Sequence, residues 1–418
     1  MTNQAYLQAL CQKAKNAARE VAILSTNVKN NVLLTMADLL LKHEKEILKE
    51  NQKDLNNARV QKLEPAKIER LTLNKKRIEE MAAGLREVAA LPDPVGEVLQ
   101  LEKRPNGMQV GRMRVPIGVI AIIYESRPNV TVDSASLCLK SGNGVILKGG
   151  SEALHSNEKL VDLFSEALKM FGVAEGAVTF INRTDRSVTT DLLKLDAYVD
   201  LVIPRGGEAL IKAVTENSRI PVIKHDKGLC HVYIDEAADL EMAKKIAINA
   251  KVQRPGTCNA METLLVHQKI APLIFPDLLE KLNQRGVELR GCAETQKYGK
   301  FVKPAAESDY HTEYLDLTLS IRVVQTMEEA INHIEKYGSR HTESIITENY
   351  SKGLRFLNEV DASAVLINAS TRLNDGYQFG LGAEIGISTT RIHARGPMGL
   401  KELTSMKFVV LGTGQIRE

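Results

Sequence analysis

The stretch Val115-Pro-Ile-Gly-Val-Ile-Ala-Ile-Ile-Tyr124 is an almost unbroken apolar run, which is typical of a strand buried on both faces of a sheet. Similar short runs follow at 144–147, 177–181, 198–203 and 220–223, with helical patterns between them, for example at 154–170 and 208–216. Buried strands separated by crossover helices predict a doubly wound, mostly parallel α/β sheet. Such a sheet binds ligands at the carboxyl ends of its strands.

A second series of short apolar runs predicts a second α/β domain further along the chain. Its strands are expected at 231–235, 263–267, 287–289, 317–324, 344–346 and 364–368, and its helices at 240–251, 271–283, 327–337 and 352–358. Residues 5–90 are helical in pattern. Residues 97–115 alternate around Asn106-Gly107, a strong hairpin signal, and 408–411 is a final apolar strand.

The composition excludes several classes of protein. A length of 418 residues predicts two or three domains, and 44% hydrophobic with 26% charged residues is typical of a globular chain. No apolar run of membrane-spanning length and no signal-like leader is present, so we expect a cytoplasmic protein with no membrane partner. A net charge of +3 without basic runs argues against nucleic acid. Five cysteines without CxxC pairs and nine histidines without HExxH spacing predict no metal site.

Cys258 is the candidate nucleophile. It lies in Gln253-Arg-Pro-Gly-Thr-Cys-Asn-Ala-Met-Glu-Thr-Leu-Leu-Val-His267, where a predicted helix turns through Pro255 and Gly256 into a short buried strand. A loop held at both ends by regular structure can fix a thiol and leave it accessible. A structural role and a catalytic role remain equally open for this cysteine on local pattern alone.

Two glycine-containing junctions follow predicted strands and are candidates for an anionic ligand. They are Lys148-Gly-Gly-Ser-Glu152 and Arg205-Gly206-Gly207, and each places backbone N–H groups and a cation where a strand meets a helix. Glycine at such a turn is also required for steric reasons alone, so ligand binding and a purely structural role stand side by side. The dinucleotide fingerprint GxGxxG does not follow any predicted strand.

Taken together, the motifs resemble the aldehyde dehydrogenase superfamily over essentially the whole chain. The resemblance rests on Pro-Gly-Thr-Cys-Asn-Ala-Met-Glu around Cys258, and on Ala-Ile-Asn-His-Ile-Glu-Lys-Tyr-Gly-Ser-Arg-His-Thr-Glu from Ala330. It also rests on Tyr-Glu-Ser-Arg-Pro-Asn from Tyr124, Leu-Lys-Gly-Gly-Ser-Glu-Ala from Leu147, and His-Ala-Arg-Gly-Pro-Met-Gly-Leu from His393. It implies two doubly wound α/β domains, one Rossmann-like for the cofactor and one catalytic, and a small β oligomerisation arm.

The expected domain bounds follow from the resemblance. Residues 1–96 and 117–228 would bind NADP, 229–400 would carry the Cys258 loop, and 97–116 with 401–418 would form the arm of a homodimer or homotetramer.

The resemblance implies reduction of L-glutamyl 5-phosphate by NADPH to L-glutamate 5-semialdehyde and phosphate, the second step of proline synthesis from glutamate. Cys258 would form a thioester that hydride then reduces. Another acylating aldehyde dehydrogenase, or a catalytically silent member that acts as a binding protein, are the alternatives. Glutamate 5-kinase is an expected partner, because an acyl phosphate is labile.

Roles for individual residues follow from the same resemblance. The cofactor-binding residues it implies are Lys148, Ser151, Glu152, Arg205, Gly206, Gly207 and Glu313. Ser370, Thr371 and Arg372 would line the substrate pocket, with Arg372 as the contact to a carboxylate or phosphate. Lys224 or His225 stands where hydrolytic relatives carry a glutamate base. Arg127 or Asn129 stands at the oxyanion position, with Asn129 as the catalytic candidate and Arg127 as a substrate contact.

Overall fold

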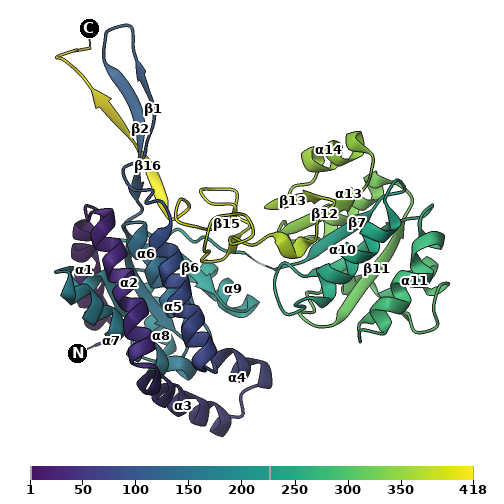
Figure 1. Cartoon of the computed structure of the whole chain (residues 1–418), viewed down its shortest axis with the longest axis horizontal. Helices are drawn as coiled ribbons and strands as arrows, with labels where there is room; N and C mark the ends of the chain where they lie inside the picture. Colours follow the sequence, from purple (N-terminus) through teal and green to yellow (C-terminus); the bar gives the residue numbers. More distant parts are fainter. Residues whose placement is uncertain (1, 226, 418) are drawn as a thin grey trace. The chain divides into compact units, whose positions relative to one another are not determined.

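The computed structural model describes residues 2–225 and 227–417, which form two compact units (Figure 1). Unit 1 contains residues 2–224, 380–386 and 398–417, and unit 2 contains the described residues of 225–379 together with 387–397. These bounds differ from the predicted 229–400 segment, because residues 380–386 pack on Leu91 and Arg205 of unit 1. A turn-rich loop carries no periodicity that reveals its packing partner.

Five helices open unit 1, as the helical pattern of residues 5–90 predicted. They are α1 (Asn3–Val21), α2 (Thr26–Lys42), α3 (Glu44–Val60), α4 (Pro65–Leu71) and α5 (Lys75–Ala90). Thr2, Ser25 and Asn74 each accept a backbone N–H at a helix start, which satisfies a donor that has no partner within the helix. Leu7, Cys11 and Ala14 form the apolar stripe by which α1 covers the sheet.

The sheet of unit 1 is parallel, with strand order β5-β4-β3-β6. Its strands are β3 (Val119–Tyr124), β4 (Gly144–Gly149), β5 (Val178–Phe180) and β6 (Leu201–Arg205), and its crossover helices are α6 (Pro128–Lys140), α7 (Leu154–Met170), α8 (Arg186–Leu192) and α9 (Glu208–Asn217). Every residue of β3 is buried, as its unbroken apolar run predicted. The strand predicted at 220–223 is reduced to one isolated bridge between Val202 and Val222.

The predicted hairpin is present and gains a third strand. β1 (Val98–Lys103), β2 (Gln109–Pro116) and β16 (Thr404–Leu411) form an antiparallel sheet with order β1-β2-β16, visible in Figure 1 as the arm of unit 1. Gly107 has a φ of 90° at the turn and donates its N–H to the Arg104 carbonyl at 2.8 Å. Apolar side chains on this arm are exposed: Val98, Leu101, Phe408, Val410 and Leu411.

Unit 2 contains a seven-stranded parallel sheet with order β10-β9-β11-β8-β7-β12-β13. Its strands are β7 (Cys230–Ile234), β8 (Met261–His267), β9 (Glu288–Gly291), β10 (Lys303–Pro304), β11 (Thr318–Val324), β12 (Thr342–Ile346) and β13 (Ala364–Ile367). Its helices are α10 (Leu240–Val252), α11 (Ala271–Asn283), α12 (Ala293–Gln296), α13 (Met327–Tyr337) and α14 (Tyr350–Glu359). A short antiparallel pair, β14 (Ile387–Ser388) and β15 (Gly396–Pro397), lies apart from this sheet.

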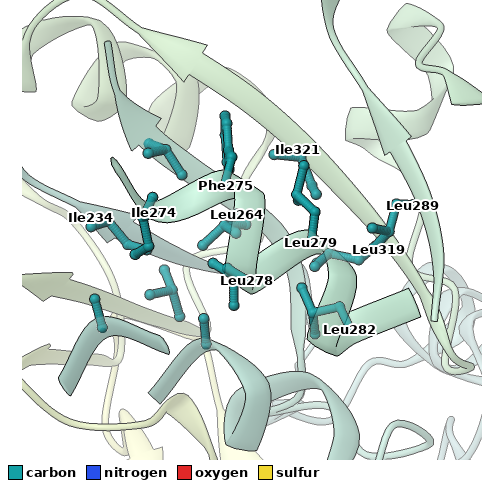
Figure 2. Close-up of a cluster of buried hydrophobic side chains, with 14 of the residues drawn as sticks. Ile234, Leu264, Ile274, Phe275, Leu278, Leu279, Leu282, Leu289, Leu319 and Ile321 are labelled. Carbon is teal, nitrogen blue, oxygen red and sulfur yellow. The ribbon is translucent and has the colours of Figure 1, made fainter. Parts of the chain in front are cut away.

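Side chains of the unit 2 strands alternate between two cores, so the sheet is doubly wound as predicted. Ile234 and Leu264 face α10 and α11, where α11 buries Ile274, Phe275 and Leu278 (Figure 2). The intervening Tyr233 and Leu265 face the opposite core, which α13 and α14 cover. No helix in the described part of the chain has both the length and the apolar character needed to cross a membrane.

Candidate active site

Cys258 lies in the loop between α10 and β8, and its side chain is neither buried nor fully exposed. The neighbouring residues fix this loop: Thr257 Oγ1 donates to the Arg254 carbonyl at 2.9 Å, and Asn259 Nδ2 donates to the Asn374 carbonyl at 3.0 Å. Cys11, Cys138 and Cys230 are buried, by contrast. The expected combination of an accessible thiol and a rigid loop is therefore present.

A buried ion pair joins the two ends of the Cys258 loop. Lys251, at the end of α10, lies 2.7 Å from the carboxylate of Glu262, in the second position of β8. Glu262 Oε1 also accepts the Leu315 N–H at 3.1 Å. Burial raises the pKa of Glu262 to about 7 and lowers the pKa of Lys251. The loop therefore starts and ends at residues that cannot separate without leaving a charge buried.

Cys230 and His341 lie directly behind Cys258, a proximity that the sequence did not reveal. Cys230 Sγ donates to the Cys258 carbonyl at 3.2 Å and lies 3.6 Å from His341 Nδ1. The His225 ring, expected near the site, lies 6.0 Å from the His341 ring, centroid to centroid. Since β7 pairs with both β8 and β12, the strand order brings these residues together at the amino ends of three neighbouring strands.

Gly228 and Glu313 approach Cys258 from a different side. A side chain at Gly228 would place its Cβ 2.0 Å from the Cys258 carbonyl oxygen, so only glycine allows this contact. The Gly228 N–H donates to Glu313 Oε1 at 2.9 Å. Gly228 therefore contacts both the Cys258 loop and Glu313, which is predicted to contact the cofactor.

The predicted substrate residues 370–372 follow β13 and turn back toward the amino end of β12. Ser370 Oγ accepts the Arg372 N–H at 3.3 Å, and Arg372 Nε donates to Gln253 Oε1 at 2.9 Å. Burial and the charge of Arg254 lower the pKa of Arg372, and the Cys258 thiol opposes this effect. The Arg372 guanidinium therefore interacts electrostatically with both Arg254 and Cys258. Thr371 is fully buried, and Ser370 is nearly so.

Unit 1 contains a cavity of about 280 Å³ at the carboxyl ends of β3 and β4. Lys148, Ser151 and Glu152 line it, together with the Gly149-Gly150 backbone. Lys148 is buried and its Nζ donates to the Gly149 carbonyl at 3.0 Å. Burial lowers the pKa of Lys148, and the charge of Glu152 partly offsets this. An ammonium, a hydroxyl and a carboxylate around an accessible backbone fit the adenosine ribose and phosphate of a dinucleotide.

The second glycine junction has a different arrangement. The Gly207 N–H at the start of α9 donates to Glu125 Oε2 at 3.1 Å, so a carboxylate already caps this helix. The Arg205 guanidinium extends toward Gly386, and its charge acts on Asp133 of α6. Cofactor contacts by Arg205, Gly206 and Gly207 stay a prediction, because a pyrophosphate here would share the N–H groups with Glu125.

The two oxyanion candidates occupy the start of α6. Arg127 is the N-cap residue of that helix, and Asn129 Nδ2 donates to Asp133 Oδ2 at 2.9 Å within it. Lys224, the cation predicted at the position of the hydrolytic base, is the last residue of the N-terminal segment of unit 1. Within the described ranges, no group of three or more His, Cys, Asp or Glu side chains is arranged to hold a metal ion.

The two sheets carry their candidate sites at opposite strand ends. The cavity of unit 1 lies at carboxyl ends, as expected for an open α/β sheet, whereas Cys258, Cys230 and His341 lie at amino ends.

A model of the aldehyde dehydrogenase family matches residues 1–312. The chain belongs to that family, and the predicted aldehyde dehydrogenase-like fold is confirmed.

Within that family the chain groups with the gamma-glutamyl phosphate reductases. The enzyme of that name from Thermodesulfovibrio yellowstonii is 58% identical over 407 residues, which cover 97% of each chain. The one from Carboxydothermus hydrogenoformans is 59% identical over 408 residues, 98% of each chain. The crystal structure of the Thermotoga maritima enzyme is 50% identical, covers 99% of this chain and 100% of its own, and has a TM-score of 0.96.

Proposed function

We propose that this protein reduces L-glutamyl 5-phosphate with NADPH to L-glutamate 5-semialdehyde and phosphate, the second step of proline synthesis from glutamate. The observation that carries the proposal is Cys258, a partly exposed thiol on a fixed loop that interacts electrostatically with the Arg372 guanidinium. The names of relatives that share more than half of the sequence support the substrate.

The chemistry begins at Cys258. Its thiolate attacks the acyl phosphate carbonyl carbon, the C–O bond to phosphate breaks, and a thioester forms as phosphate departs. Arg372 favours the thiolate and attracts an anionic substrate, because its guanidinium group interacts electrostatically with Cys258 and stays charged at neutral pH. The Cys258 N–H is the donor we assign to the developing oxyanion, with Arg127 or Asn129 as the second group.

NADPH supplies the hydride that reduces the thioester. Lys148, Ser151 and Glu152 would hold its adenosine end in the cavity of unit 1. Glu313 would orient the nicotinamide ribose, since its carboxylate is fixed by the Gly228 N–H. After hydride addition the C–S bond to Cys258 would break, which frees the aldehyde and returns Cys258 as a thiolate.

The residues at the position of the hydrolytic base agree with this reaction. Lys224 and His225 stand there, and the His225 ring contacts His341 edge-on. A reductase that releases phosphate does not activate water against its thioester, so it has no use for a glutamate base. Cations at this position instead suit a substrate that carries phosphate and carboxylate groups.

The alternatives separate in one assay of NADPH formation from glutamate semialdehyde. The proposed reductase requires inorganic phosphate as the acceptor of its acyl group, whereas another acylating aldehyde dehydrogenase would turn over without phosphate when a different acceptor, such as coenzyme A, is supplied. A silent binding protein would show no turnover at all. Cys258→Ser should abolish turnover and leave cofactor binding intact. Cys292→Ser is the control, because Cys292 is also partly exposed and lies 3.4 Å from Thr295 Oγ1, and it should remain active. Full activity in Cys258→Ser would refute the nucleophile.

We also propose a cytoplasmic homodimer or homotetramer assembled through the arm. The exposed Phe408, Val410 and Leu411 are the apolar surface that such a contact would cover. Light scattering of Phe408→Glu should show a smaller species, and an unchanged mass would contradict this role. We also expect glutamate 5-kinase to pass its product, glutamyl 5-phosphate, directly to this protein. Transfer kinetics that do not change when kinase is added would contradict this partnership.

A further inference from the structure

One wall of the unit 1 cavity comes from a segment outside both glycine junctions. Leu63 and Lys67 line the cavity beside Lys148, Ser151 and Glu152. Lys67 lies in the first turn of α4 and its side chain is exposed. Because Lys67 and Glu152 line the same cavity, a ribose held by Glu152 would have this cation of α4 among its neighbours.

One polar residue of α3, Asn51, fixes the position of α4 against the cavity. Asn51 Nδ2 donates to the Leu71 carbonyl at 2.9 Å and to Ser156 Oγ at 3.0 Å, while Asn51 Oδ1 accepts the Leu73 N–H at 2.9 Å. Asn51 is buried, so these bonds are protected from water. The end of α4 is thereby tied to the first turn of α7.

An apolar cluster strengthens this attachment. Leu55 and Ala58 of α3 pack with Leu71 of α4 and with Ala153, and Ile68 and Leu63 cover them. Ala153 directly follows Glu152, so the cluster fixes α4 relative to the residue expected at the ribose. Lys67 therefore belongs to the same rigid body as the cavity floor.

The backbone at the start of α7 is unable to serve a phosphate. Asp54 Oδ1 accepts the His155 N–H at 3.1 Å, and Asp54 Oδ2 accepts the Ser156 N–H at 2.8 Å. A helix start normally offers such N–H groups to an anion, but here a carboxylate occupies them. Positive charge must come from side chains, and the cations among the described lining residues are Lys67 and Lys148.

Because Glu152 is negatively charged, the number of cations in the cavity decides whether it can bind a 2′-phosphate. A carboxylate near the ribose reads the 2′-hydroxyl of NAD and repels the 2′-phosphate of NADP. Glu152 Oε1 is turned to Ser126, accepting its N–H at 2.7 Å and its hydroxyl at 2.6 Å. Lys148 is bonded to the Gly149 carbonyl and shares its field with Glu152. A second cation is needed to favour a dianionic 2′-phosphate over a hydroxyl.

We propose that Lys67 contacts the ribose 2′-phosphate and makes unit 1 select NADPH over NADH. This inference rests on the proposed function, in that unit 1 binds the cofactor through Lys148 and Glu152. It assigns the nucleotide specificity to α4, a helix outside the strand-to-helix junctions of the sheet.

Equilibrium titration of the full chain with 2′,5′-ADP and with 5′-AMP tests the inference without any turnover. The natural chain should bind 2′,5′-ADP more tightly. Lys67→Gln should weaken 2′,5′-ADP binding about tenfold, the effect of one charge-assisted contact, and leave 5′-AMP binding unchanged. Lys49→Gln, on the exposed surface of α3, is the matched control and should alter neither. Added salt should reduce the difference between the natural chain and Lys67→Gln.

An unchanged affinity of Lys67→Gln for 2′,5′-ADP overturns the inference, and so does a natural chain that binds the two nucleotides equally. These failures are separate from a failure of the proposed function. If the inference alone is wrong, the protein still turns over, and its turnover still depends on Cys258 and on phosphate. If the protein binds neither nucleotide and shows no phosphate-dependent turnover, both the inference and the proposed function are wrong.

Discussion

The thiol of Cys230 donates a hydrogen bond to the main-chain carbonyl of Cys258, with the sulfur 3.2 Å from the oxygen. Cys230 is fully buried, and burial raises the pKa of its thiol well above the ordinary value. The thiol stays neutral and keeps its proton for the carbonyl oxygen. We therefore expect Cys230 to position the Cys258 loop and to take no part in bond formation.

Replacing Cys230 separates the hydrogen bond from the volume of the side chain. Cys230→Ala should lower kcat about tenfold with little change in KM, because the loop loses one buried hydrogen bond. Cys230→Ser keeps a donor and should recover most of the rate. Steady-state kinetics of both variants check this. An equal loss in the two variants would point to packing and contradict the positioning role.

Gly228→Ala should disrupt the nucleophile loop. The added Cβ would lie 2.0 Å from the Cys258 carbonyl oxygen and 2.5 Å from its Cα, and both are backbone atoms that cannot rotate away. A displacement of about 1 Å at a nucleophile costs about 100-fold in rate. Gly84→Ala in α5 is the control, since nothing lies within 4 Å of its Cβ position. Full activity of Gly228→Ala would contradict the contact.

Arg372 should govern the binding of the anionic substrate. Arg372→Gln removes the charge and should raise KM about 10- to 100-fold, and Arg372→Lys should recover only part of this, because an ammonium lacks the planar donor pair. Arg395→Gln provides a control, as Arg395 pairs with Asp361 on the surface. The measurement is KM for glutamate semialdehyde and phosphate. Equal KM values in the natural chain and Arg372→Gln would exclude the contact.

The pair of Lys251 and Glu262 should show strong coupling in stability. Lys251→Met alone leaves a buried carboxylate without its partner and should cost about 3 kcal/mol or more in the free energy of unfolding of unit 2. Combining Lys251→Met with Glu262→Gln should cost less than the sum of the single changes, since Gln can still accept the Leu315 N–H. Urea denaturation measures these values, and additive losses would contradict the pairing.

Asp133 gives a pH dependence of known sign. Burial raises its pKa from 3.8 to about 6, so the folded chain holds the proton more tightly than the unfolded chain. The stability that this group contributes is complete below about pH 4 and is lost as pH rises through about 6. Asp133→Asn should therefore exceed the natural chain in stability at pH 7.5, by at most about 3 kcal/mol, and match it at pH 4.

Thermal unfolding at the two pH values checks the Asp133 prediction. Asparagine keeps an acceptor for Asn129 Nδ2, so the hydrogen bond within α6 is preserved. A stability difference of the same size at both pH values would show that packing, and not titration, is responsible.

The regular elements could be predicted where the periodicity is long. The predicted bounds of α7, α11 and α13 agree with the structure, because each has a continuous set of buried apolar residues, and those of α11 and α13 pack on the sheet of unit 2. The strand expected at 220–223 is short and contains Pro221, which has no N–H for a ladder, so only one bridge forms. Helix α12 and strand β10 were missed, as such short polar elements depend on tertiary packing.

Only part of the candidate site could be predicted from the sequence. The Cys258 loop could be recognised because a helix and a buried strand flank it. Cys230 and His341 could not be placed beside it, since their proximity depends on β7 lying between β8 and β12, and no local pattern specifies that order. The engagement of Asn129 with Asp133 and of Gly207 with Glu125 depends on side-chain rotamers. Sequence spacing does not determine these.

Strand β16 pairs along the whole length of β2, although about three hundred residues separate them in the chain. Unit 2 lies between these strands in the sequence. During synthesis, the ribosome therefore completes all of unit 2 before it makes β16, the edge strand of unit 1. The usual order, in which the N-terminal domain closes first, is reversed here. Until β16 is made, β2 has an unpaired edge in the nascent chain, and such an edge can pair with another chain.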